Sequence, residues 1–338
     1  MASFISRNPR YVVLVLVAIV TIFYLMTPGS EPPPRAVFWP DADLPNRVAR
    51  ADSIYQKLLL DRKDLIKKFG PTPNDVALFP PNKDPWPAYT VWDFFPAAYN
   101  CPHEVQRLGA LGDGGKWVCG ITRVEAKPDC IVYSFGIDHE SSFEAEILAN
   151  TDGCQIWGYD WSVNAFNHEI PRSQAHRTHF HPFGLAGTVK LGPEDTQKTY
   201  TLESLMKMNG HTHIDILKVD IEGSEFEALA TLVKPYIASN QPLPFGQLQL
   251  EIHIWKRSFA EYLAWWEMLE AAGLRPFWTE PNLVYQNYNR GSTTELADYS
   301  FLNVKGDNIF IKDPERLPPS GEDEFEHGHG AGPTTHYD

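Results

Sequence analysis

The sequence predicts an α/β protein in which helices cover both faces of a mostly parallel β-sheet. From Cys130 onward, short apolar segments alternate with segments of helical periodicity, which is the pattern of a parallel sheet built from strand–helix units. Glycine or acidic residues also end several of the apolar segments. In open α/β sheets the ligand binds at this end of the strands, so the chain is expected to have a ligand crevice there.

The predicted strands and helices follow one another along most of the second half of the chain. The expected strands are 130–136, 154–160, 178–186, 214–222 and 245–255, and the expected helices are 141–150, 201–208, 224–236 and 259–273. The last two strands, 274–281 and 299–305, are expected to form an antiparallel hairpin. The final strand would then run against the rest of the sheet.

The N-terminus predicts a membrane anchor. Arg7 and Arg10 precede an uncharged apolar run over residues 11–26. A helix of this length spans roughly 24 Å, which suits the thinner membranes of the early secretory pathway. The arginines favour a cytosolic segment 1–10, so a single-pass type II protein in the Golgi or endoplasmic reticulum is expected, with its bulk in the lumen. The alternative is a cleaved signal peptide, whose apolar core is of similar length.

Residues 27–99 are expected to form a stem that contains an amphipathic helix over 46–69. This helix either associates with a second copy or packs on the domain that follows, and its pattern does not decide between them. The domain itself is expected over residues 100–313. The tail 314–338 has few apolar residues and is expected to be disordered.

The four cysteines all follow the predicted anchor, in a compartment where disulfides form. We expect Cys101 to pair with Cys119 and Cys130 with Cys154, because the second pair begins two strands predicted to be neighbours. Four free buried thiols are the alternative, and the spacings do not resemble a zinc site. With 29 Lys and Arg against 43 Asp and Glu, the net charge of −14 argues against a nucleic-acid partner.

Acidic residues stand where strand 214–222 ends. Glu222 and Glu225 suit the N-terminus of the next helix, whose dipole favours negative charge. Asp220 is still inside the strand, and Gly223 turns the chain immediately after it. Asp220 is therefore predicted to point into the ligand crevice rather than to stabilise the helix.

The next strand repeats this feature, because Gln249, Glu251 and His253 alternate with apolar residues and share one face. If the two strands are neighbours, Asp220, Glu222, Glu251 and His253 converge. Such a group can take a proton from a substrate hydroxyl or hold a divalent cation. The alternative for Glu251 and His253 is an internal hydrogen-bond network.

Two further residues predict a nucleoside site. Gly136 ends the first strand, and the helix that begins near Ser141 directs its N-terminus to the same place. Asp160 ends the second strand, at a distance along the chain where an acid can bind a ribose diol. The chain lacks a GxGxxG motif, so a nucleoside without a pyrophosphate fits better than a dinucleotide.

At these residues the chain resembles the class I S-adenosylmethionine-dependent methyltransferases, in particular FkbM-like enzymes and the related eukaryotic methyltransferase-like proteins with an N-terminal anchor. The similar motifs are, in order, LGDGGKWVCG, VYSFGIDHESSFE, WGYD, FGLAG, ILKVDIEGSEFEAL and LQLEIH. The resemblance extends over roughly residues 100–255. It implies a Rossmann-like fold and S-adenosylmethionine as cofactor, although the usual glycine-rich loop keeps one glycine.

The resemblance also implies roles for individual residues. Gly136 would lie against the methionine part of the cofactor, Asp160 would bind its ribose, and Asp220 would lie beside the sulfonium and the substrate. The other residues expected at the cofactor lie in the same motifs: Ser134, Phe135, Phe143, Glu144, Gly184 and Leu185.

The sequence thus predicts a membrane-anchored lumenal methyltransferase that modifies a hydroxyl of a small molecule or glycan. Asp220 is the first candidate for removing the proton and His253 the second, with Glu222 and Glu251 beside them. One alternative is a lumenal glycosyltransferase that holds a metal with Asp220 and Glu222. Another is an inactive binding protein of the same fold. The sequence identifies neither the acceptor nor the oligomeric state.

Overall fold

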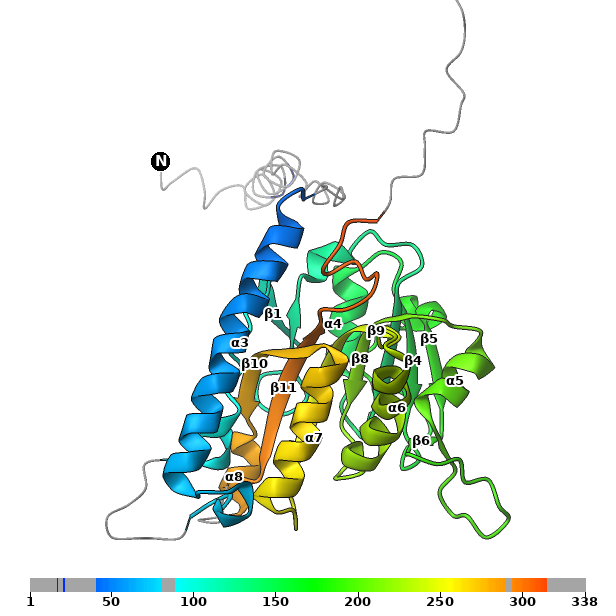
Figure 1. Ribbon diagram of the computed structural model, residues 1–338. Coiled ribbons are helices and arrows are strands. Elements are labelled where there is room, and N and C mark those ends of the chain that lie inside the picture. Colours follow the sequence, from blue (N-terminus) through cyan, green and yellow to red (C-terminus); the bar gives the residue numbers. More distant parts are fainter. Residues whose placement is uncertain (1–16, 18–20, 22–40, 81–88, 290–293, 315–338) are drawn as a thin grey trace, which may run out of the picture. The chain divides into compact units, whose positions relative to one another are not determined.

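The computed structural model describes Val17, Thr21 and residues 41–80, 89–289 and 294–314. The chain divides into two compact units, Met1–Trp39 and Pro40–Asp338. The second unit contains a seven-stranded sheet with the strand order β10-β11-β9-β8-β3-β4-β5 (Figure 1). The predicted α/β fold is confirmed.

The strands of this sheet run mostly in parallel. Strands β3, β4, β5, β8 and β9 are parallel neighbours, whereas β11 is antiparallel to both β9 and β10. The antiparallel final strand is therefore confirmed, and it inserts between β9 and β10. The strands are β3 (Ile131–Phe135), β4 (Gln155–Tyr159), β5 (Thr178–His181), β8 (Ile214–Val219), β9 (Phe245–His253), β10 (Leu274–Pro281) and β11 (Leu296–Asn303).

The predicted strand 178–186 is too long. Strand β5 ends at His181, where Pro182 follows and has no N–H to continue the ladder. The remainder of the segment forms β6 (Gly184–Leu185), which pairs with β7 (Thr199–Tyr200) in a separate two-stranded sheet.

Helices cover both faces of the large sheet. Side chains of α5 (Leu202–Asn209), α6 (Glu225–Ser239) and α7 (Phe259–Ala272) pack on one face in the larger of two buried apolar clusters. Helix α4 (Ser142–Asn150) packs on the other face, together with an antiparallel hairpin. The hairpin consists of β1 (Val105–Leu108) and β2 (Lys116–Cys119).

Shorter helical segments lie in the connections. Helix α8 (Leu283–Asn289) connects β10 to β11. Short 3-10 helices are η1 (Pro73–Asp75), η2 (Val91–Phe94), η3 (Ile121–Arg123) and η4 (Arg172–Arg177).

The predicted amphipathic helix is α3 (Leu44–Phe69), and it packs on the sheet domain next to β10 (Figure 1). The Arg62 guanidinium donates two hydrogen bonds to the Glu270 carboxylate of α7, at 2.8 and 2.9 Å. The Tyr55 hydroxyl donates to the same carboxylate. The structure thus favours the second of the two arrangements that the sequence left open for this helix.

Both expected disulfides are confirmed. Cys101 is bonded to Cys119 and Cys130 to Cys154. The second bond joins the residues just before β3 and β4, which are parallel neighbours whose first residues face each other. The reason for preferring this pairing therefore holds.

The predicted anchor, residues 11–26, lies outside the described residues apart from Val17 and Thr21, and so does the predicted tail beyond residue 314. Within the described ranges, no helix combines the length and the apolar character that a membrane span needs.

Candidate functional site

The chain reverses its direction across the sheet between β3 and β8, which is where open α/β sheets bind ligands. From β3 it proceeds outward to β4 and β5, and it then returns to β8 and β9 on the other side. The ends of the two central strands touch, because the Asp220 amide donates to the Phe135 carbonyl. The predicted site residues of both halves lie around this point.

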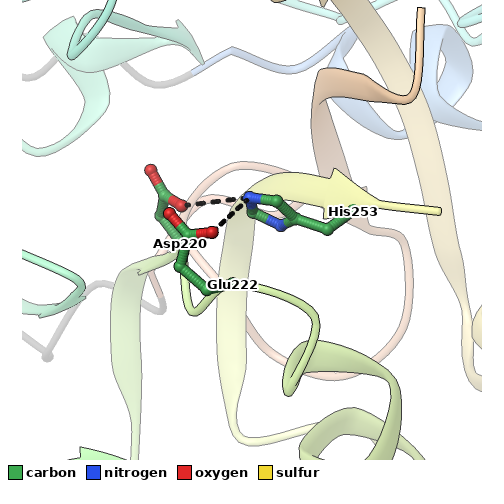
Figure 2. Close-up of side chains that lie close together, drawn as sticks. All are labelled: Asp220, Glu222 and His253. Atoms are coloured by element: carbon green, nitrogen blue, oxygen red, sulfur yellow. Dashed lines mark ion pairs between the residues drawn. The ribbon is translucent and has the colours of Figure 1, made fainter. Parts of the chain in front are cut away.

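Strands β8 and β9 are neighbours, so Asp220 and His253 lie together at their ends. His253 Nε2 is 4.0 Å from Asp220 Oδ1 and 3.7 Å from Glu222 Oε2 (Figure 2). Figure 2 shows the imidazole directed toward both carboxylates. Three of the four residues predicted to converge therefore do so around the imidazole, and Glu251 lies beside Asp220 and shares a lysine with it.

That lysine, Lys116, was not among the predicted site residues. It lies at the start of β2 and is 2% exposed. Its Nζ is 2.6 Å from Asp298 Oδ1, 3.5 Å from Glu251 Oε2 and 3.9 Å from Asp220 Oδ2. Burial alone would lower the pKa of Lys116, but the three carboxylates outweigh it and raise the pKa. The ammonium therefore connects the ends of β8, β9 and β11 to the hairpin.

Burial, which by itself lowers the pKa of the lysine, raises the pKa of the carboxyl groups around it. It raises the pKa of Asp298 to about 7, although the nearby ammonium acts in the other direction. It also raises the pKa of Glu251, and the neighbouring charge of Asp220 adds to this increase. Asp298 and Glu251 are direct cross-strand partners, so without Lys116 two carboxylates would face each other.

Glu225 has a larger role than its predicted place at a helix N-terminus suggested. It is the first residue of α6, as expected, but its carboxylate is fully buried. Its Oε1 accepts a hydrogen bond from the His253 backbone N–H at 2.8 Å and lies 3.3 Å from His253 Nδ1. The carboxylate thus orients the imidazole whose other nitrogen faces Asp220 and Glu222.

The charge state of His253 follows from these carboxylates. Burial would lower its pKa, but Glu225, followed by Asp220 and Glu251, outweighs burial and raises the pKa to about 9. The imidazole is then protonated at neutral pH and has no free lone pair. This favours Asp220 over His253 as the acceptor of a substrate proton.

The predicted alternation along β9 is confirmed. The apolar residues pack toward α6 and α7, while Gln247 and Gln249 face the hairpin. Gln247 exchanges two hydrogen bonds with the backbone of Cys119, and Gln249 donates to the Trp117 carbonyl. This part of the polar row therefore bonds to β2. The end of the row, at His253, lies beside Asp220 and Glu222.

Gly136 is required for a close backbone contact at the end of β3. A Cβ atom at this position would lie 1.8 Å from the Asp220 carbonyl oxygen, and its φ of 77° also favours glycine. Its N–H donates to the Tyr159 carbonyl, and its own carbonyl accepts from Lys218 Nζ at 2.7 Å. The glycine thus allows the ends of β3 and β8 to meet.

Asp160 follows β4 and organises the loop after β3. Its Oδ1 accepts from the Ser162 N–H and hydroxyl at 2.7 and 2.6 Å, and its Oδ2 accepts from the Asp138 N–H at 2.8 Å. Burial would raise the pKa of Asp160, but these hydrogen bonds outweigh it and lower the pKa. The adjacent Trp161 is 53% exposed. Reasoning from the sequence missed this ring, although a tryptophan directly after a strand-ending acid was a usable signal.

The remaining predicted cofactor residues fall into two groups. Gly184 lies beside the Asp160 segment, because a Cβ there would be 3.1 Å from Trp161 Cδ1, and the buried Leu185 follows it in β6. The others have buried side chains: Ser134, Phe135, Phe143 and Glu144. The Ser134 hydroxyl donates to the Glu144 carboxylate, so these two polar groups bond to each other. Gly184 therefore lies next to the residue that follows Asp160, whereas the side chains of these four residues are buried in the core.

Comparison with known proteins gives matches over this same region. Residues 71–293 match a sequence family described as "Methyltransferase domain". "Probable methyltransferase-like protein 24" of Rattus norvegicus is 29% identical over 129 residues, which are 37% of this chain and 33% of the rat protein. The protein of the same name from Homo sapiens is 28% identical over the same shares. The alignment thus spans a third of the length of these relatives.

Solved structures give matches at low identity. The fibrillarin pre-rRNA processing protein of Methanococcus jannaschii matches with a TM-score of 0.31 and 11% identity, over 61% of this chain and 73% of that chain. Methyltransferase FkbM of Methylobacillus flagellatus KT matches with a TM-score of 0.29 and 15% identity, over 52% and 44%. The family match covers well over half of the 338 residues and includes Gly136, Asp160, Asp220 and His253, so the chain belongs to the methyltransferase-domain family.

Proposed function

We propose that this chain is an S-adenosylmethionine-dependent methyltransferase that methylates a hydroxyl oxygen of a small molecule or glycan. The observation that carries the proposal is the junction between β3 and β8. On one side of it lie Asp160 and the exposed Trp161, and on the other side lies the carboxylate of Asp220. A nucleoside-containing methyl donor and an acceptor hydroxyl fit these two sides.

The residues on the Asp160 side fit the nucleoside part of the cofactor. A carboxylate can accept both hydroxyls of a ribose, and the Ser162 hydroxyl, which bonds to Asp160 Oδ1, can rotate away to make room. The exposed ring of Trp161 offers an apolar face on which adenine can stack. We therefore assign ribose binding to Asp160 and adenine contact to Trp161.

The residues on the Asp220 side fit the acceptor. When bound, S-adenosylmethionine supplies an electrophilic methyl group, so the protein needs to align the acceptor and remove one proton. The Asp220 side chain is 23% exposed, more than its neighbours Lys116 and His253. We assign proton removal to Asp220 and its orientation to Lys116 and His253, which flank its two oxygens.

We further propose that the protein works in the lumen of the secretory pathway, anchored by residues 11–26. The two disulfides support this, because such bonds persist in oxidising compartments and are rare in the cytosol. The acidic net charge is consistent with a small-molecule or glycan acceptor rather than a nucleic acid.

Calorimetry with S-adenosylhomocysteine tests the cofactor assignment. The wild-type full-length chain should bind it, and Trp161→Ala should weaken binding by about 1–3 kcal/mol, the usual range for a base stacked on an aromatic ring. Trp278→Ala is the matched control, because this tryptophan is also partly exposed but lies on β10, and its removal should leave the affinity unchanged.

Two outcomes would contradict the proposal. A correctly folded wild type that binds no S-adenosylhomocysteine would favour an inactive protein of the same fold. Binding of a UDP-sugar with Mn²⁺ in its place would favour the glycosyltransferase alternative.

A further inference from the structure

Three potential metal ligands meet at the ends of β8 and β9. One carboxylate oxygen each from Asp220 and Glu222 and one ring nitrogen of His253 all lie within 4.8 Å of one another (Figure 2). Two of the groups come from a single turn of chain, and the third comes from the neighbouring strand. Ligands that converge from two elements in this way resemble one face of a coordination sphere.

His253 provides an independent sign of a ligand. It is 2% exposed, and its Nδ1 and backbone N–H both face the buried Glu225 carboxylate. Its Nε2 makes no hydrogen bond within the described ranges, since the nearest carboxylate oxygens, Glu222 Oε2 and Asp220 Oδ1, are 3.7 and 4.0 Å away. A buried imidazole held by a carboxylate at one nitrogen, with the other aimed at further ligands, is the usual arrangement of a metal-binding histidine.

The charge around the three groups also suits a cation. The carboxylates of Asp220, Glu222 and Glu225 all lie near the imidazole. The ammonium of Lys116 lies near the other oxygen of Asp220, Oδ2, so Oδ1 stays directed toward His253. Asp220 can therefore contact Lys116 and a metal ion at the same time.

We infer that Asp220, Glu222 and His253 bind one divalent transition-metal ion of the Mn²⁺ or Zn²⁺ type. Two carboxylate oxygens and one imidazole nitrogen suit these ions better than Mg²⁺ or Ca²⁺, which prefer oxygen ligands alone. Neighbouring ligands of such an ion are about 3 Å apart, so the three groups have to approach each other slightly. Glu222, whose side chain is 76% exposed, has room to do so. The ion would replace the proton on Nε2, as at any histidine ligand.

The role of the ion rests on the proposed function, whereas its binding does not. Three protein ligands leave coordination positions for water or an acceptor hydroxyl. A hydroxyl bound there would pass its proton more readily to Asp220 Oδ2, the carboxylate oxygen not directed at the ion, because the ion stabilises the alkoxide that remains to attack the methyl group. The inference therefore narrows the acceptor to a hydroxyl that can reach the ends of β8 and β9.

Electron paramagnetic resonance of Mn²⁺ tests the site directly, because bound Mn²⁺ loses the sharp signal of the free ion. The purified full-length chain, first stripped with EDTA, should bind one Mn²⁺ that Zn²⁺ displaces and an equal concentration of Mg²⁺ does not. Glu222→Gln and His253→Gln should each weaken binding by about 10-fold or more. Glu227→Gln is the matched control, since Glu227 is exposed on the same helix as Glu225 and should leave binding unchanged.

A wild type that binds no Mn²⁺, or binding that survives both Glu222→Gln and His253→Gln, would overturn the inference. Glu222 is exposed, so its variant should melt like the wild type even if the buried His253 variant does not fold. Calorimetry keeps the two proposals separate. S-adenosylhomocysteine binding without Mn²⁺ binding removes the metal site alone, and the reverse result removes the proposed function alone.

Discussion

At the scale of single residues, Lys116 determines whether the acidic groups of the site can be buried together. Its ammonium lies among Asp298, Glu251 and Asp220, which come from three strands of the sheet. Buried carboxylates without a counter-charge lose their hydration and repel one another. The lysine therefore stabilises the fold and holds Asp220 in place for its proposed role.

We predict that Lys116→Met lowers the free energy of unfolding by about 3 kcal/mol at neutral pH, the low end of the range for breaking a buried ion pair from one side. Chemical denaturation measures this. The loss should shrink between about pH 8 and about pH 5, where Asp298, with its pKa of about 7, takes up a proton.

The sign of this pH dependence follows from the raised pKa of Asp298. A carboxyl that keeps its proton in the folded state favours folding below its unfolded pKa, and this contribution is lost as the pH rises through about 7. Without Lys116 the carboxylate is harder to form in the folded state, so the variant loses more stability than the wild type on the alkaline side. If the loss of unfolding free energy in Lys116→Met does not change with pH, the loss comes from packing alone and not from the charge of Lys116. Lys63→Met, an exposed position on α3, should change little.

At the scale of elements, two segments that precede the large sheet in the sequence pack against it in the structure. The β1–β2 hairpin bonds to the polar row of β9. Helix α3 bonds to β10 through Asp52 and Arg275, and to α7 through Tyr55 and Arg62. Tyr55, Arg62 and Trp266 all donate to the Glu270 carboxylate. Helix α3 therefore supplies both the counter-charge and part of the hydrogen bonding of a buried acid on α7.

We predict that a fragment beginning at residue 71, where the family match starts, is less stable than a fragment beginning at residue 41. Removal of α3 leaves the Glu270 carboxylate without Arg62 and Tyr55, which should cost about 3–5 kcal/mol. Thermal melting of the two fragments checks this. Equal melting temperatures would show that the domain does not need the helix.

The sheet could be predicted from the sequence because its signals are local. Apolar runs and helical periodicity mark each element, and the alternation of Gln249, Glu251 and His253 showed which face of β9 is polar. One exception within the sheet was the segment after His181, where Pro182 ends the strand and was given too little weight. Another was the predicted strand 214–222, because β8 ends at Val219 and Asp220 lies directly after the strand rather than inside it.

The complete site could not be predicted, because its partners are distant in sequence. Lys116 and Asp298 are 182 positions apart, and only the strand order brings them together. Glu225 was correctly expected at the start of a helix, but nothing in the local pattern shows that this turn aims it at His253. The residues that orient Asp220 and His253 are thus brought to the site by the order of the strands, which the local sequence does not show.

At the scale of the whole molecule, two covalent links fix the ends of the central strands and of the hairpin. Cys130–Cys154 joins the starts of β3 and β4, and Cys101–Cys119 ties the end of β2 to the chain just before β1. They close loops of 24 and 18 residues. Both links lie at the amino ends of their strands or in the hairpin, away from the β8 and β9 ends that carry the proposed site.

We predict that the double variant Cys130→Ala/Cys154→Ala lowers the free energy of unfolding by about 3 kcal/mol, the usual effect of a link that closes a loop of this length. Chemical denaturation under non-reducing conditions measures the loss. The variant should keep its affinity for S-adenosylhomocysteine where it is folded, because the link lies at the opposite end of the strands from Asp160. A reducing agent should destabilise the wild type at least as much, because it breaks both bonds, and it should destabilise the variant further by breaking Cys101–Cys119. A wild type whose cysteines react with a thiol reagent without prior reduction would contradict both the bond and the oxidising compartment proposed for this protein.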